Sequence, residues 1–404
     1  MNRSKSIRIL LMGLLLGLPT WNWAAADVSP GDVIDKTNWQ KAEGLLPEPI
    51  LNWVKNGDFV LNIEELNLNP SEFCSPAALK SKEGNVGKYE VDEGDGIIDV
   101  KTGKLPDFIE GMPFWKIDPN DPKACQKMMY SRVYNSYSTV HFMLPGRIIW
   151  VGRKGYEREV GMTYMQLNMD GYPPAKELKN PDNIERYLIL SVTKPYDLVG
   201  IATMLWRYRG TRQDMNFAYA PAIRRVRRTS PASRSDAMLG SDCILDDPTG
   251  FDGKIPAFEW KLIEQREALL PFVSKDPDRL VQNEMGEWEE RPDEVKMLVY
   301  GYEKDGWQGA PWCPVNAVWV KRPVWVIEIT PKDPYYNYGV SYLWLDPETS
   351  FGAYKVVTNR AGAHWKVVMQ IYGWMESADK KVRYMSSRGG LVIDDISRHA
   401  SRTT

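Results

Sequence analysis

The sequence predicts a mainly β protein whose core is one large antiparallel sheet that curls or closes, with a few short helices and long loops. From about residue 128 onward, short runs rich in β-branched and aromatic residues follow one another, bounded by Gly, Pro and Asp. Few of the intervening segments are long enough for a crossover helix, so neighbouring strands are expected to pair antiparallel. About a dozen strands in one sheet are expected to curl or close rather than to stay flat.

The first 26 residues are expected to be a cleavable export signal. Basic residues precede the apolar run 9–18, and the alanines at 24–26 are typical of a cleavage site. A retained membrane anchor is less favoured, because a membrane-spanning helix needs about 20 apolar residues. No later run reaches about 18 apolar residues. We therefore expect an exported protein that is soluble or peripherally bound to a membrane.

The segment 27–127 is expected to be an irregular N-terminal part that packs on the sheet or wraps around it. Many Pro, Gly, Asn and Asp residues punctuate it with turns. Residues 39–54 are expected to form one or two short helices, interrupted at Pro47 and Pro49. The acidic run 92–99 lacks the spacing of an EF-hand loop, so a solvated turn is favoured there over a calcium site.

The sheet domain is expected to span residues 128–395, followed by a polar tail at 396–404. The expected strands are 133–143, 147–153, 156–169, 186–193, 202–209, 214–228, 257–267, 295–302, 317–329, 339–345, 353–359, 364–374 and 382–394. The clearest alternation places Trp365, Val367 and Met369 on one face of a half-buried strand. Helical stretches are few: 180–185 and 196–198 are short connectors, and 277–283 is expected to form about two turns.

The charge balance and the aromatic content limit the possible partners. The chain has 51 basic and 53 acidic residues, which argues against nucleic acid. It has 16 Trp and 20 Tyr against 10 Phe. Trp and Tyr combine an apolar body with a polar edge, which suits a lined cavity or a broad contact surface. A large sheet, which also favours aromatic residues, is an equally good explanation.

The four cysteines, Cys74, Cys125, Cys243 and Cys313, are expected to form disulfides. An even number of cysteines in an exported chain favours bonds, and three pairings are possible. The simplest is Cys74–Cys125 with Cys243–Cys313, since each bond closes a loop within one half of the chain. The absence of a CxxC motif argues against a zinc ribbon or a redox motif.

No catalytic residue, cofactor or metal ligand can be assigned from the sequence. Only three histidines are present, His141, His364 and His399, and there is no HExxH, GxSxG, Walker or Rossmann motif. A Ser-His-Asp site is recognised by geometry, so a hydrolase with an unrecognised site stays an alternative.

The densest basic feature is Arg224, Arg225, Arg227 and Arg228, at the end of the expected strand 214–228. In a strand these residues alternate between the two faces, so both faces carry charge. One interpretation is a strand that runs past the sheet edge into solvent, where arginine deters edge-to-edge pairing. The other is a contact for an anionic head group, which guanidinium groups bind bidentately.

Three stretches carry a family resemblance. They are 204–210 with 214–228, Asp242 with 251–253 and 258–262, and 333–339 leading to 342–346. Over about residues 130–375 the chain resembles a domain-of-unknown-function family of periplasmic proteins of Proteobacteria. That family is grouped with the outer-membrane lipoprotein-sorting proteins, the LolA and LolB type carriers.

The resemblance implies a strongly curved antiparallel sheet, a half-open barrel whose concave side is plugged by helices or loops. It implies a non-enzymatic periplasmic carrier for a lipid or another large hydrophobic molecule, serving outer-membrane trafficking. An accessory subunit of a resistance-nodulation-division type envelope transporter, or a partner of an outer-membrane protein, is the alternative. The carriers are about half this length. Candidate ligand-wall residues on the expected strands are Trp206, Tyr208, Phe217, Tyr219, Trp260, Trp344 and Trp365.

Overall fold

The structure is a computed structural model that describes residues 28–136, 141–286, 288–291 and 293–404. The expected export signal at 1–26 lies outside these ranges. In the part of the chain that the structure describes, no helix is long and apolar enough to cross a membrane.

One 17-stranded sheet dominates the described chain, and a two-stranded hairpin stands apart from it. The large sheet contains β1 (Val33–Ile34), β2 (Leu61–Ile63), β5 (Phe142–Gly152), β6 (Gly155–Asn168), β7 (Ile184–Lys194), β8 (Ala202–Tyr208), β9 (Met215–Ala220), β10 (Arg225–Thr229), β11 (Phe258–Phe272), β12 (Asp278–Gln282), β13 (Trp288–Glu290), β14 (Val318–Pro331), β15 (Ser341–Asp346), β16 (Phe351–Thr358), β17 (His364–Ser377), β18 (Arg383–Asp394) and β19 (His399–Thr403). The hairpin is β3 (Tyr89–Val91) and β4 (Ile97–Asp99).

Helices are short and few. The α-helices are α1 (Glu48–Asn56), α2 (Pro76–Asn85) and α3 (Ala124–Ser136). The 3-10 helices are η1 (Trp39–Ala42), η2 (Pro70–Glu72), η3 (Pro173–Glu177), η4 (Tyr196–Leu198), η5 (Pro231–Ser235), η6 (Met238–Gly240), η7 (Pro248–Gly250), η8 (Ile255–Ala257) and η9 (Gly301–Glu303). The prediction of a mainly β fold with a large curved antiparallel sheet is confirmed.

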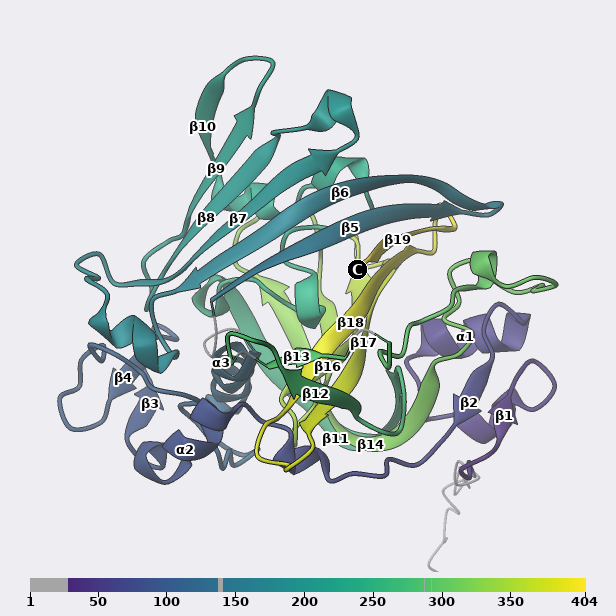
Figure 1. The fold of residues 1–404 in the computed structure, drawn as a ribbon, viewed down its shortest axis with the longest axis horizontal. Coiled ribbons are helices and arrows are strands. Elements are labelled where there is room, and N and C mark those ends of the chain that lie inside the picture. The colour runs from purple at the N-terminus through teal and green to yellow at the C-terminus, as the bar shows by residue number, and fades with distance from the viewer. Residues whose placement is uncertain (1–27, 137–140, 287, 292) are drawn as a thin grey trace, which may run out of the picture.

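Successive strands of the large sheet pair antiparallel. At one end the sheet closes into a ring, and at the other it ends in a free edge strand. The order β10-β9-β8-β7-β6-β5-β19-β18-β17-β16-β15-β14-β11 is antiparallel throughout. The end of β11 then pairs parallel with β17, at Phe272 and Tyr372, and β12 continues that pairing. Strands β11, β14, β15, β16 and β17 therefore close a ring. Strands β5–β10, which we call the arm, extend from it to a free edge at β10 (Figure 1).

Within 396–404, where we expected a polar tail, residues 399–403 form strand β19 of the sheet. Strand β19 pairs with β18 on one side and with β5 on the other, so it joins the arm to the ring. The short polar sequence does not reveal this, because β5 and Asp242, which help to bury it, are far away in the chain. Ser401 Oγ donates to Asp242 Oδ2 at 2.7 Å, and His399 Nδ1 lies 2.6 Å from the same oxygen.

Three expected elements differ in the structure. Residues 124–136 form α3 rather than the start of a strand at 133, and β5 begins only at Phe142. Helix α3 is buried almost all round, so its sequence lacks the amphipathic period that marks a surface helix. Residues 278–282, expected to be helical, are the paired strand β12. Residues 295–302 contain one bridge, between Tyr300 and Pro314, and no strand.

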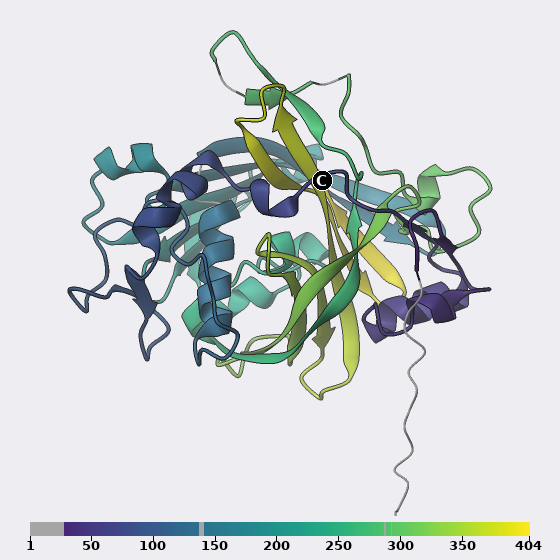
Figure 2. The same ribbon diagram turned by 90° about the horizontal axis from the view of Figure 1, so that it is seen from below.

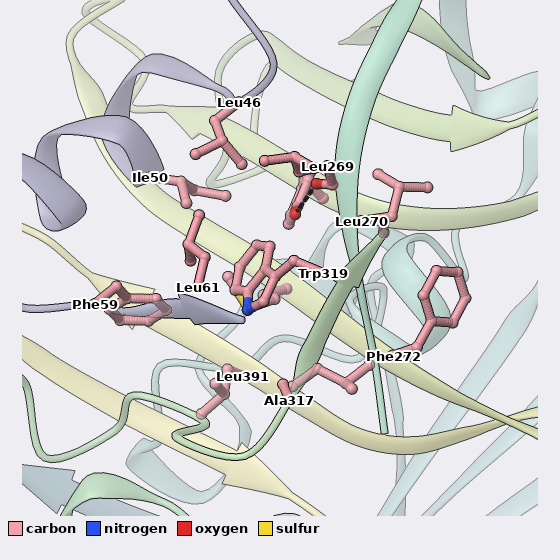
Figure 3. Packing of buried hydrophobic residues seen from close by; sticks show 14 of the residues in the cluster. Leu46, Ile50, Phe59, Leu61, Leu269, Leu270, Phe272, Ala317, Trp319 and Leu391 are labelled. Atoms are coloured by element: carbon pink, nitrogen blue, oxygen red, sulfur yellow. Dashed lines mark hydrogen bonds between the residues drawn. The ribbon is translucent and has the colours of Figure 1, made fainter. Parts of the chain in front are cut away.

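Both faces of the ring strands are buried. On one face, Val367, Met369 and Ile371 of β17 belong to a cluster that includes α1 and β2. Figure 3 shows the centre of this cluster, where N-terminal apolar side chains surround the fully buried Trp319 of β14. On the other face, Val368 belongs to a cluster that includes α3 and the β3–β4 hairpin. Residues 28–127 thus cover the sheet from two sides (Figure 2).

The four cysteines are free and buried, so the disulfide prediction is wrong. Cys74 lies in a small cluster beside α2, and Cys313 lies in the Trp319 cluster. Cys125 and Cys243 lie in the α3 cluster. Burial raises the pKa of Cys74 to about 11 and those of Cys125 and Cys313 to about 12, because an apolar surrounding disfavours the thiolate. The thiols act as small apolar packing groups.

We expect all four thiols to be unreactive in the folded protein and free in the unfolded one. Protein purified without reductant should take up almost no maleimide in native buffer, because maleimide attacks exposed thiolates. After unfolding in guanidinium it should take up four labels per chain, counted by intact mass. A gain of only two labels or none would show that disulfides are present.

We expect His399 to stabilise the junction between the arm and the ring mainly at low pH. The hydrogen bond to Asp242 raises the pKa of His399, so folding favours its protonated form. That stability is fully present below the ordinary pKa of about 6.5 and is lost as pH rises through the higher folded value. The difference in the free energy of urea unfolding between wild type and His399→Ala should therefore be larger at pH 5.5 than at pH 9. A separation that grows with pH would contradict this assignment.

Candidate functional site

An uncovered apolar face runs across the arm. The strand registers place Met143 of β5 opposite Met165 of β6, and Met165 opposite Ile189 of β7. Ile189 in turn lies opposite Met204 of β8. Directly opposed residues point to the same face of a sheet, so these four side chains form one continuous row. Met143 is 68% exposed, which leaves this end of the row open to solvent.

A groove of about 650 Å³ lies on this face. Its lining residues are His141, Phe142, Met143, Met165, Gln166, Leu167, Tyr187, Ile189 and Met204. Pockets for small molecules have volumes of about 300–1,000 Å³ and are lined mainly by apolar groups with a few polar ones. The groove fits that description, since its lining residues are mostly apolar and His141 and the Tyr187 hydroxyl are polar groups among them.

Two predicted wall residues border the groove. Trp206 lies opposite Tyr187 in the register, with the ring centroids 5.8 Å apart, and its ring is 5.4 Å from that of Phe217. The indole Nε1 of Trp206 contacts the sulfur of Met204 at 3.3 Å. Tyr219 follows on the same face, two residues beyond Phe217 on β9. The apolar face therefore continues from the groove across β8 and β9.

His141 supplies a neutral polar position at one end of the groove. The Asn168 backbone N–H donates to Nδ1 at 3.2 Å, and the imidazole ring meets Tyr172 edge-on at 4.9 Å. Burial lowers the pKa of His141 below its ordinary value. The ring is therefore uncharged at neutral pH, and its Nδ1 acts as an acceptor.

Buried ion pairs fix the opposite face of the same strands. Arg186 and Arg207 alternate with Tyr187 and Trp206, so they point away from the groove. Arg186 Nη2 binds Asp252 Oδ1 at 2.6 Å. Arg207 Nε binds Asp214 Oδ2 at 2.9 Å and its guanidinium also donates to the backbone carbonyl of Asp252.

Asp252 is the shared acceptor of this buried network. Burial by itself would raise the pKa of its carboxyl group, but the charges of Arg186, Arg207 and Arg234 outweigh burial and lower it. Arg234 approaches Asp252 to 3.5 Å and pairs with Asp246 at 2.6 Å. Asp252 therefore stays ionised and holds β7 and β8 to the 231–257 segment.

The stretches that carry the family resemblance supply this network. Tyr336 donates to Asp246 and Tyr338 donates to Asp247, both at 2.9 Å, and all four side chains are buried. Asp252, Tyr336 and Tyr338 lie in those stretches, whereas Asp246 and Asp247 lie between two of them. Their role in the structure is to pair buried charge rather than to line the groove.

The other predicted wall residues lie elsewhere. Tyr208 is buried at the end of β8, beneath the guanidinium of Arg212. Trp344 is buried in the Trp319 cluster. The indoles of Trp260 and Trp365 pack against the α3 cluster and donate to the Ile255 carbonyl and to Asp394. None of these four lines the groove.

The basic run forms a strand of its own. The expected strand 214–228 is divided by a turn, so β10 folds back on β9 and Arg224 lies in the turn with a φ of 49°. The register places Val226 and Arg228 on the groove face, and Arg225 and Arg227 on the other. All four arginines are exposed and form no ion pair with any described residue.

The histidine–aspartate contacts do not form a nucleophile relay. Ser401 and His399 bind the same oxygen of Asp242, so the hydroxyl donates to the carboxylate instead of to the imidazole. His364 binds Asp395, which also accepts from the Trp53 indole. Within the described ranges, no group of three or more His, Cys, Asp and Glu side chains could hold a metal ion.

The sequence did not single out the groove's methionines, leucine and isoleucine. In the stretch 184–194 both faces carry apolar residues, so alternation alone does not reveal which face is covered. The arginines at 186 and 207 were the available signal. A charged side chain needs either solvent or a buried partner, so these arginines indicate that the two faces of each strand have different surroundings.

We expect the loss of Asp252 to be among the most damaging single changes in the arm. Asp252→Ala leaves three guanidinium groups without their shared counter-charge and should lower the free energy of unfolding by about 3–5 kcal/mol. The exposed Asp305 offers a control, since Asp305→Ala should change it by less than about 0.5 kcal/mol. Urea titration at pH 7 measures both values, and equal effects would refute the central role of Asp252.

The comparisons with known proteins bear on the family. The family described as "Protein of unknown function (DUF1329)" matches residues 33–402. Similar solved structures include a putative outer membrane lipoprotein-sorting protein domain from Vibrio parahaemolyticus, at 14% identity over 69% of this chain and 88% of that chain with a TM-score of 0.44. A DUF1329 family protein from Desulfovibrio piger has 14% identity, covers 65% and 81%, and has a TM-score of 0.40. A LolA superfamily protein from Nitrosomonas europaea has 12% identity, covers 69% and 89%, and has a TM-score of 0.39.

No curated protein matches the chain. The expected resemblance to a domain-of-unknown-function family is confirmed by the match over 33–402. Because that match spans almost the whole sequence, the chain belongs to the DUF1329 family, whose function is unknown.

Proposed function

We propose that the protein is a non-enzymatic periplasmic carrier that binds a lipid or another large hydrophobic molecule in the groove of the arm. The observation that carries the proposal is the apolar groove on a sheet face that no described element covers. Folded proteins rarely expose a contiguous apolar face unless it binds something. The expected export signal supports the compartment.

The chemistry of the lining suits a flexible apolar ligand. Each Å² of apolar ligand surface removed from water contributes about 25 cal/mol to binding. Met143, Met165 and Met204 have unbranched, polarisable side chains that adapt to ligands of different shape. Trp206 and Tyr187 at the border offer polar edges to the more polar end of such a molecule.

Of the four arginines, Arg228 is the one proposed to contact an anionic head group. It lies opposite Phe217 on the groove face, whereas Arg225 and Arg227 point to the other face. Its guanidinium is exposed and unpaired among the described residues, so it is available to a phosphate or carboxylate. The proposed wall residues are accordingly Trp206, Phe217 and Tyr219, with the groove's own lining.

The central test places a charge on the groove floor. Ile189 lies between Met165 and Met204, so Ile189→Lys should weaken binding of a fluorescent fatty acid by about 10–100-fold through lost apolar burial. Ile396→Lys, at an exposed turn outside the groove, is the matched control and should bind like wild type. Thermal unfolding checks that both variants are folded. Wild type that binds no probe and releases no lipid on organic extraction would overturn the proposal.

A further inference from the structure

The free end of the arm carries two adjacent hairpin turns. One, at 194–200, joins β7 to β8, and the other, at 220–225, joins β9 to β10. The turns touch, because a Cβ atom built on Gly200 would lie 3.1 Å from Cγ of Pro221. In Figure 1 this end of β9 and β10 projects away from the rest of the molecule. We call the two turns and β10 the tip.

The tip exposes apolar side chains. Tyr196 is 94% exposed, Val226 is 65% exposed and Ile223 is 47% exposed. Val199, in the same turn as Tyr196, is also exposed. Single exposed apolar residues are ordinary, but the tip exposes four, three on its turns and one on β10, which favours an apolar binding partner. A tyrosine among them suits the boundary between water and lipid.

The tip is also strongly basic. Arg224, Arg225, Arg227 and Arg228 are all exposed and form no ion pair with the described residues. Lys194 is already paired with Glu159, and Asp197 is the acidic residue of the two turns. The unpaired positive charge therefore complements a surface of dense negative charge.

We propose that the tip docks onto the surface of an anionic lipid bilayer. Arginines attract anionic head groups, and the exposed apolar side chains insert at the boundary of the acyl region. The narrow turns would contact a flat protein surface through only a few residues. In a bilayer they can insert between the lipid head groups. The inference goes beyond the carrier proposal and holds whether or not the groove binds a lipid.

The register connects the docking surface with the groove. On one face of the arm, Val226 lies opposite Tyr219, and Tyr219 opposite Ala202. In the neighbouring row, Phe217 lies opposite Met204 at the groove. Apolar side chains therefore continue along this face of the arm from the tip to the groove.

Vesicle flotation with the full-length mature protein tests the charge. Wild type should float with vesicles containing about one third phosphatidylglycerol and stay behind with pure phosphatidylcholine. The triple variant Arg224→Gln, Arg225→Gln and Arg227→Gln should lower the partition coefficient by about 100-fold, since each arginine contributes about fivefold. The control triple Arg153→Gln, Arg279→Gln and Arg360→Gln removes the same charge from exposed sites elsewhere and should float like wild type.

A labelled cysteine tests insertion independently of charge. Because the native thiols are buried, Tyr196→Cys should take up an environment-sensitive dye selectively. Its emission should shift to the blue with phosphatidylglycerol vesicles, while the dye on Tyr335→Cys, another exposed site, should not shift. Flotation that is equally reduced in both triple variants, or no dye shift at 196, would overturn the proposal. Fatty acid binding to the groove is a separate readout, so either proposal can fail alone.

Discussion

The arm depends on the buried charge of Asp252. A carboxylate in a protein interior is tolerated only when paired, and here Arg186, Arg207 and Arg234 share it. The arginines belong to two adjacent strands and to η5, so satisfying one charge fixes the relative position of three segments. The buried charges on one face of the arm are therefore paired with one another. The opposite face carries none of these pairs.

The strand period converts this constraint into a binding surface. With Arg186 and Arg207 held inward, their neighbours Tyr187 and Trp206 are forced to the opposite face. Because no described element covers that face, its apolar row stays accessible. In the ring, by contrast, both faces of β17 are filled by the N-terminal segment, and aromatic residues such as Trp344 and Trp319 serve packing.

The local period of the sequence was enough to predict the sheet but not the parts fixed by distant contacts. The alternation in β17 predicted a half-buried strand, yet both its faces are buried because α1 and α3 come from elsewhere in the chain. The polar sequence of β19 predicts a tail, because its partner β5 is distant in sequence. Trp206 and Phe217 were identified from residue type alone, whereas the neighbouring Met165 and Ile189 required the register. Free cysteines could not be foreseen from their even number.

The place of β19 has a consequence for how the chain folds. It pairs Ala400 with Val151, and most of the sheet domain lies between these two residues in the sequence. This pairing connects the arm to the ring. Contacts this distant in sequence form slowly, because a long loop must close before they contribute. The sheet therefore cannot be completed until β19 is available. A chain that emerges N-terminus first would therefore keep the arm and the ring unjoined until β19 has been made.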